Sequence, residues 1–287
     1  MGNMRLPREG PAAIGPVALS AGRLVTGNLG TDVAWATVDP VPESGRVWAA
    51  LSELHPRTGL VPIQLDGLRI DTLPLAASRA LIEPDGLRPW DNGEFITPED
   101  PRGADGLDVA TLLGEMWRGW VPAARDDDPE LARIRAPFGF QFPGLAPPQS
   151  RPVAPAERQR ILDSVLPRMR AAHGAAPAAR IGLVTADRPA DVPAVIGWGG
   201  LVNRGESLLP LSAVLRSWED RFGAQLIDVG YAGLRLLVER PPRTLPAAQR
   251  IAAEHVVLAD EGLEGFWDIP NLAPRLVNAP VWTFWWD

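Results

Sequence analysis

Residues 215–223 (LRSWEDRFG) are dense in charged side chains opposite the apolar stripe of an expected helix. An arginine presents a fork of N–H donors that suits a carboxylate or phosphate, and a nearby glutamate can accept a proton. The stretch therefore predicts a site for an anionic substrate, with Arg216 and Arg221 as clamps and Glu219 as general base. The alternative is an exposed helix face with ordinary ion pairs, in which Arg216 and Asp220 pair across one turn.

The second candidate is the sequence AAEH at residues 252–255. His255 is the best single catalytic candidate, because the pKa of an imidazole lies near neutrality. It also falls on the inward face of the expected helix, so a core histidine is the alternative. Adjacent helical residues diverge by about 100°, and Glu254 is therefore expected to pair with Arg250 one turn earlier. The other histidines are expected to stabilise helix C-termini: His55 and His173.

A glycine-rich sequence, GWGG at residues 197–200, precedes the long helix and is followed by Asn203. Such loops can hold phosphates on their backbone amides. This one lacks the spacing of the known nucleotide-binding motifs, and there is no lysine to complete a P-loop. A structural turn around a packed Trp198 is the favoured interpretation, and ligand binding by Trp198 and Asn203 is the alternative.

Three of the eleven tryptophans lie in the last six residues, which end in Asp287. In a strand, Trp282, Phe284 and Trp286 would share one face, and Trp285 and Asp287 the other. One face should pack against helices. The other face would leave Trp285 near the surface as a contact for a protein or ligand, unless the strand is buried on both sides.

The composition excludes several classes of chemistry. All 28 basic residues are arginines, and the chain has no lysine, no cysteine and only three histidines. Lysine Schiff bases, thiol nucleophiles and cysteine-bound zinc are therefore excluded. We expect neither a metal site nor a cofactor. The net charge of −7 argues against a nucleic-acid partner and favours a basic protein or cationic ligand, or simply solubility.

No apolar run approaches the length of a membrane span, and the first ten residues lack a signal-peptide pattern. The expectation is a cytoplasmic protein with no membrane partner. Five prolines fall within residues 143–155. They predict a linker over residues 143–157 between an N-terminal mixed α/β region, 1–142, and a C-terminal α+β domain, 158–287.

In the N-terminal region, strands are expected at residues 31–38 and 60–65, the latter at a sheet edge because it contains Pro62. Helices are expected from Ser44 to His55 and over residues 109–117. In the C-terminal region, the pattern predicts strands at 180–185, 225–229, 234–239 and 281–286, with helices at about 211–222 and 245–259. This β-α-β-β-α-β string is that of the ferredoxin-like fold.

Residues 181–287 resemble the bacterial domain of unknown function 4253 (DUF4253), common in actinobacteria. The motifs that carry the resemblance are Gly197-Trp198 with Asn203, the sequence AVLRSWEDRFGA at 213–224, AAEH at 252–255, and Trp282-x-Phe284-Trp285-Trp286-Asp287. Weaker matches lie upstream, at Thr58-Gly59-Leu60, Arg88-Pro89-Trp90 with Gly93-Glu94, and residues 143–146. The segment after His255 departs from the pattern of the family.

Two functions remain open, and the resemblance implies neither activity nor ligand. The first is a non-catalytic protein- or ligand-binding module that uses its acidic, tryptophan-rich surface, and bacterial conflict or toxin immunity is one setting for it. The second is a hydrolase or transferase that acts on an anionic substrate through Glu219, Arg221 and His255. The sequence does not fix an oligomeric state.

Overall fold

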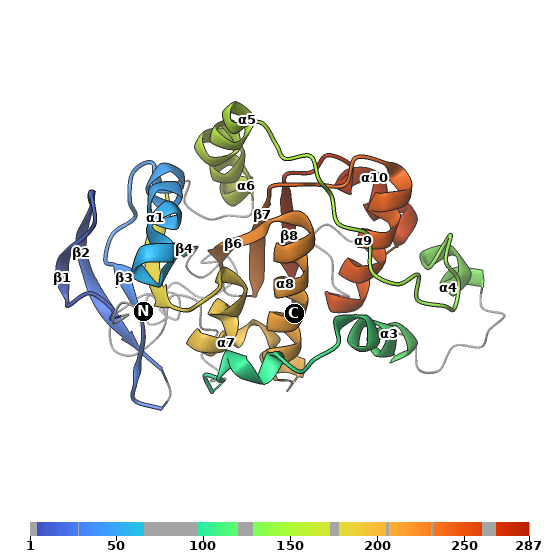
Figure 1. The fold of residues 1–287 in the computed structure, drawn as a ribbon, viewed down its shortest axis with the longest axis horizontal. Coiled ribbons are helices and arrows are strands. Elements are labelled where there is room, and N and C mark those ends of the chain that lie inside the picture. Colours follow the sequence, from blue (N-terminus) through green and yellow to red (C-terminus); the bar gives the residue numbers. More distant parts are fainter. Residues whose placement is uncertain are drawn as a thin grey trace.

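The computed structural model describes residues 5–27, 29–65, 97–119, 129–172, 178–204, 207–230, 232–259 and 268–286. Within these ranges the chain forms a mixed eight-stranded sheet in the order β1-β2-β3-β5-β4-β6-β7-β8, with helices on both faces (Figure 1). This agrees with the predicted α+β class. The strands are β1 (Gly10–Ile14), β2 (Val17–Thr26), β3 (Asp32–Thr37), β4 (Leu60–Leu65), β5 (Arg180–Thr185), β6 (Ala224–Val229), β7 (Gly233–Val238) and β8 (Val281–Trp285).

The helices follow the predicted pattern in the C-terminal part and add several short elements. The α-helices are α1 (Ser44–Thr58), α3 (Val109–Gly119), α4 (Pro129–Ile134), α5 (Pro155–Arg160), α6 (Leu166–Ala172), α7 (Val192–Ile196), α8 (Leu209–Phe222), α9 (Leu245–Leu258) and α10 (Ile269–Leu276). One π-helical turn, η3 (Ile161–Val165), joins α5 to α6. The described ranges also contain three 3₁₀ turns: η2 (Pro101–Ala104), η4 (Pro189–Asp191) and η5 (Gly199–Arg204).

The sheet separates two hydrophobic cores, because successive side chains of a strand point to opposite faces. In β4, Val61, Ile63 and Leu65 belong to the core beneath α3, α7, α8 and α9. Leu60 belongs to the opposite core, which α1, η3 and α6 cover. The result is a three-layer arrangement in which strands of the sheet are buried on both sides.

Strand β4 lies in the middle of the sheet, so the predicted edge position is wrong. It pairs antiparallel with β5 along its whole length and parallel with β6 only at Gln64 and Leu65. Pro62 is tolerated because its missing N–H falls outside the short ladder with β6. The indole of Trp48 on α1 donates to the Pro62 carbonyl at 2.9 Å, which satisfies that buried acceptor. Helix α1 also continues through Pro56 to Thr58, beyond its predicted end.

The C-terminal string β5-α8-β6-β7-α9-β8 contains the predicted elements, with further short helices between them. Their order in the sheet differs from the ferredoxin-like one. A ferredoxin-like sheet would place the first and last strands, β5 and β8, side by side. Here β8 forms the far edge, and β4 from the N-terminal part lies between β5 and β6. One sheet therefore includes strands from both sides of residues 143–157, and the division of the chain into two regions joined by this segment stays a prediction.

Residues 143–153, which we call the strap, run in extended form from α4 toward α5 across α9 (Figure 1). Arg250 of α9 donates to the Pro143 carbonyl at 2.6 Å, and the Val153 N–H donates to the Glu239 carbonyl at 2.7 Å. Ala146 is 1% exposed. The proline-rich segment is therefore bound along the protein surface.

Gly22 of β2 gives room for the buried indole of Trp35 on the neighbouring strand. A Cβ added at Gly22 would lie 2.1 Å from Trp35 Cζ2. We expect Gly22→Ala to lower the free energy of unfolding by roughly 1–3 kcal/mol, as for other overpacked cores. Urea unfolding measures this change. Gly106→Ala is the matched control because open space surrounds Gly106. An equal effect of the two substitutions would contradict the argument.

Candidate binding groove beside helix α8

Helix α8 positions the charged residues of the 215–223 motif. Pro210 lies in its first turn, and Gly223 ends it in the left-handed conformation with φ of 60°, as its sequence predicts. Trp218 and Phe222 face the core and are 0% exposed. The same helix geometry turns Arg216 and Asp220 toward the segments that precede α3 and α7.

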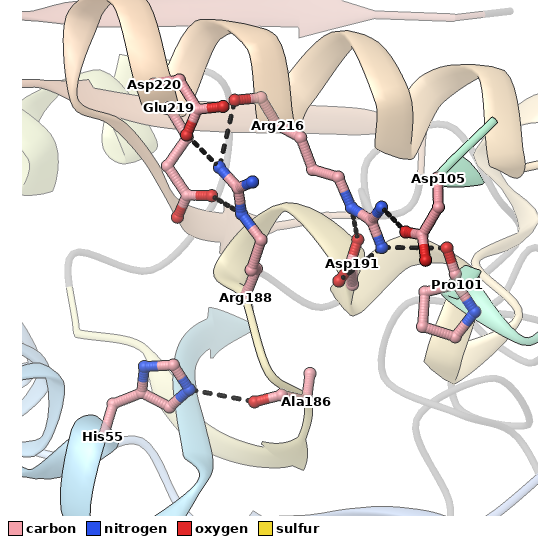
Figure 2. A network of polar contacts seen from close by, with 9 residues as sticks. All are labelled: His55, Pro101, Asp105, Ala186, Arg188, Asp191, Arg216, Glu219 and Asp220. Atoms are coloured by element: carbon pink, nitrogen blue, oxygen red, sulfur yellow. Dashed lines mark hydrogen bonds and ion pairs between the residues drawn. The ribbon is translucent and has the colours of Figure 1, made fainter. Parts of the chain in front are cut away.

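Arg216 connects α8 to two other segments. Its Nε and Nη2 donate to the two carboxylate oxygens of Asp191 at 2.6 and 3.0 Å, and its Nη1 donates to Asp105 at 2.6 Å. Nη2 also donates to the Pro101 carbonyl at 2.8 Å (Figure 2). The guanidinium therefore ties η2 and η4 to α8. The predicted pairing of Arg216 with Asp220 is wrong, because Asp191 and Asp105 take the guanidinium.

Arg188, which follows β5, holds the next turn of α8. Its Nε donates to Glu219 at 2.7 Å, and its Nη2 donates to Asp220 at 2.5 Å and to the Arg216 carbonyl at 3.2 Å (Figure 2). Burial raises the pKa of Glu219 above its usual value, while Arg188 partly offsets that rise. Glu219 is thus a structural partner of Arg188 in this arrangement.

A groove of about 430 Å³ lies beside these residues, and we call it the α8 groove. Segments from η2 to the start of α3 form one wall, and the polar face of α8 forms the other. The ion-pair network beside the groove contains four carboxylates and two guanidiniums, an excess of two negative charges: Asp105, Asp191, Glu219 and Asp220 against Arg188 and Arg216. Arg221 also lines the groove, and the charge of its partner Glu254 balances its own. The side chains of Asp105 and Asp220 are 64% and 67% exposed, whereas that of Arg216 is 16% exposed. Carboxylates therefore dominate the accessible rim.

Arg221 belongs to a separate, buried cluster. Its Nη1 and Nη2 donate to the two carboxylate oxygens of Glu254 on α9 at 2.9 and 2.6 Å. Glu254 is 0% exposed and also accepts from the Trp218 indole and the Ala146 N–H, each at 2.7 Å. The Ala146 carbonyl accepts from Arg221 at 2.8 Å. The pair thus binds both the N–H and the carbonyl of one strap residue.

This cluster corrects the predicted pairing of Glu254 with Arg250. Arg250 lies one turn away on α9 but donates to the strap at Pro143. Glu254 points inward to α8, where Arg221 and the Trp218 indole satisfy its charge. The bidentate ion pair of Glu254 with Arg221 stabilises the fold more than a surface pair with Arg250 would, because an unpaired buried charge is strongly destabilising.

His255 lies in the aromatic core, 5% exposed. Its ring centroid is 4.7–4.9 Å from those of Trp218, Trp282 and Phe284. Burial lowers its pKa to about 3, and Arg221 adds to the effect. The imidazole is therefore neutral at pH 7, and its Nε2 has no hydrogen-bond partner among the described residues.

The contacts do not bring Glu219, Arg221 and His255 to one point. Glu219 binds Arg188, Arg221 binds Glu254, and His255 contacts aromatic rings. Within the described ranges, no group of three acidic, histidine or cysteine side chains gathers to hold a metal ion. None of the described helices has the length and apolar character of a membrane span.

Trp198 is a core residue. It is 0% exposed, and its indole donates to the Gly230 carbonyl at 2.9 Å. A Cβ at Gly200 would lie 2.0 Å from the Trp198 ring, so this glycine is needed for close packing. Asn203 lies in η5, and its side chain is outside the described residues.

Strand β8 places its aromatic residues on two faces, as predicted. Trp282 and Phe284 point into the core, and Trp286, just after the strand, is also buried. Trp285 is half-buried on the opposite face, and its ring would lie 3.3 Å from a Cβ added at Gly233. Asp287 and His173 lie outside the described residues. His55, in the last turn of α1, contacts the Ala186 carbonyl at 2.9 Å (Figure 2).

The sequence analysis missed three residues of the groove: Arg188, Asp191 and Asp105. A signal existed for two of them, because Asp187, Arg188 and Asp191 form a charged run immediately after a buried strand. Polar residues at the end of a buried strand are candidates for a site. Asp105 carries no local signal.

The charged residues of α8 and α9 and the aromatic strand β8 all fall within one stretch of sequence. Residues 180–287 match the family described as Domain of unknown function (DUF4253). The DUF4253 segment is less than half of the chain, and it contains every residue of the two clusters except Asp105 and the residues of η2 and the strap. No curated protein and no solved structure matches the chain.

Proposed function

We propose that this protein is a non-catalytic binding module that holds a basic side chain of a protein partner in the α8 groove. The observation that carries the proposal is the excess of carboxylates in the groove network, with Asp105 and Asp220 exposed at its rim. A cationic side chain that enters the groove meets these two carboxylates first. Such charge complementarity guides association and selects partners.

The arginines of the groove support a cationic rather than an anionic ligand. Arg216 already donates to two carboxylates and one carbonyl, and Arg188 donates to two carboxylates. An incoming anion would have to displace these partners and would face the exposed Asp105 and Asp220. The overall charge of −7 acts in the same direction.

The alternative, a hydrolase or transferase that uses Glu219, Arg221 and His255, has less support. A general base must reach the proton that it abstracts. His255 is buried among aromatic rings, and Glu219 and Arg221 are held by different partners. The bacterial, actinobacterial source, the cytoplasmic location and a role in conflict or immunity remain parts of the proposal that rest on the resemblance and the composition.

A short blocked peptide with two arginines tests the proposal, with the same peptide carrying citrulline as the uncharged comparison. We expect Asp105→Asn/Asp220→Asn to weaken binding of the arginine peptide at low salt by about fivefold, which is the loss of affinity expected when two exposed charges are removed from the edge of a binding site. Titration calorimetry at two salt concentrations measures the loss, which salt should diminish. Asp191 continues to hold Arg216 in this variant, so the groove keeps its shape.

The matched control is Asp39→Asn/Glu53→Gln, which removes two charges from exposed positions outside the groove. It should bind the arginine peptide as the wild type does. Equal affinity for the citrulline peptide, or an equal loss in the control, would show that the groove does not select a basic side chain.

A further inference from the structure

A second hollow lies at the N-terminal end of the sheet and shares no lining residue with the α8 groove. It has a volume of about 530 Å³, within the range that accommodates small organic ligands. The N-terminal segment, strands β2 and β3, the end of β5 and helix α7 contribute to it. Its apolar lining includes Leu24, Val33 and Val195.

Two arginines of this pocket have no acidic partner. Arg5 and Arg8 both line it and are exposed, and neither takes part in an ion pair in the described part of the chain. Among the described lining residues, Asp32 is the single acid, and it accepts a hydrogen bond from the Thr26 hydroxyl at 3.0 Å. Among its described lining residues, the pocket thus presents two guanidiniums without an acidic partner beside an apolar wall.

The backbone at Arg8 is fixed to the sheet. The Trp35 indole donates to the Arg8 carbonyl at 3.1 Å, and Trp35 is 0% exposed. The next residue, Glu9, accepts a hydrogen bond from the Leu24 N–H at 3.4 Å. These contacts hold residues 8 and 9 against β2 and β3, and they place the Arg8 side chain beside the pocket.

We propose that this pocket binds an anionic amphiphile, a molecule with a carboxylate or phosphate head and a short hydrocarbon tail. Arg5 and Arg8 pair with the head, because guanidinium groups form strong charge-assisted hydrogen bonds with either anion. The tail packs against Leu24, Val33 and Val195 and leaves water. The inference does not depend on the function proposed for the α8 groove.

The probes are octanoate and octyl phosphate as monomers, with 1-octanol and octylammonium as comparisons of equal tail length. We expect at least one of the two anions to bind the full chain saturably, 1-octanol to bind more weakly, and octylammonium most weakly. Arg5→Gln/Arg8→Gln should weaken anion binding by about tenfold or more, since both charge-assisted contacts are lost. Titration calorimetry and ligand-observed NMR measure the affinities.

The matched control is Arg57→Gln/Arg168→Gln, which removes two exposed arginines that lie outside the pocket. It should leave the affinity unchanged. Octylammonium binding as tightly as the anions, or an anion affinity that is unaffected in Arg5→Gln/Arg8→Gln, overturns the proposal. The absence of saturable anion binding also overturns the proposal. If, in that case, anionic vesicles capture the chain through Arg5 and Arg8, the two arginines would be assigned to contact with a membrane surface.

Discussion

Glu254→Leu lowers the free energy of unfolding by about 3–5 kcal/mol, the range for breaking a buried ion pair by removing one partner. Three donors lose their acceptor at once: the Arg221 guanidinium, the Trp218 indole and the Ala146 N–H. Of these, the Arg221 charge is the largest loss, because its side chain is only 12% exposed. Urea unfolding of the full chain measures the change.

Two further variants separate the charge from the packing. Arg221→Met/Glu254→Leu should be more stable than Glu254→Leu alone, because the double variant leaves no unpaired charge behind. Arg160→Met/Glu157→Leu removes an exposed pair of the same chemistry on α5, whose side chains are 56% and 42% exposed, and should change stability by less than about 1 kcal/mol. If Glu254→Leu behaves like the exposed pair, the cluster does not hold the strap as we describe.

The second large expected effect is a loss of folding stability at acidic pH, and we expect His255 to cause it. Its pKa is about 3 in the folded chain, whereas an unfolded histidine titrates near pH 6.5. Between these values the unfolded chain binds a proton that the folded chain does not bind. The stability associated with the neutral imidazole is therefore complete above pH 6.5 and falls by up to roughly 1.4 kcal/mol per unit as pH decreases toward 3.

The measurement is the difference in unfolding free energy between wild type and His255→Phe at several pH values from 7 to 4. Phenylalanine keeps a ring among Trp218, Trp282 and Phe284 but cannot titrate. The difference should shift in favour of the variant as pH falls. Parallel curves for wild type and His255→Phe would assign the acid sensitivity to other groups.

Local signals predicted the elements well where one stretch of chain determines its own structure. The apolar spacing from Leu211 to Phe222 and the following Gly223 predicted α8 almost to the residue. The same holds for α9, where Thr244 caps the N-terminus by accepting from the Ala247 N–H at 3.4 Å. Helical periodicity and capping depend on neighbours in sequence, and a single sequence contains them.

Ion-pair partners could not be predicted in the same way. A helix offers each charged residue a neighbour one turn away, and the sequence analysis paired Arg216 with Asp220 on that basis. The structure brings Asp105 from 111 residues away and Asp191 from 25 residues away. These distant carboxylates meet Arg216 only after the chain has folded, so the candidate site depended on long-range contacts that no local pattern marks.

The prediction of the strand order in the sheet was wrong for the same reason. The sequence showed that residues 60–65 form a strand, but Pro62 indicated an edge. The ladder with β6 is confined to Gln64 and Leu65, and this short overlap lets a proline-containing strand enter the interior of the sheet. That overlap depends on the relative positions of two strands almost 160 residues apart, which periodicity does not encode.

The position of β4 bears on how the boundaries of this family are understood. Strands β5 and β6 both belong to the DUF4253 segment, yet neither pairs with the other, because β4 fills the space between them. A fragment that began at residue 180 would leave β5 without either neighbour and β6 with one unpaired edge, the kind of surface that joins to other chains and aggregates. In this chain the segment that matches the family and the smallest unit that closes its own backbone hydrogen bonds are different, and the second includes residues 60–65.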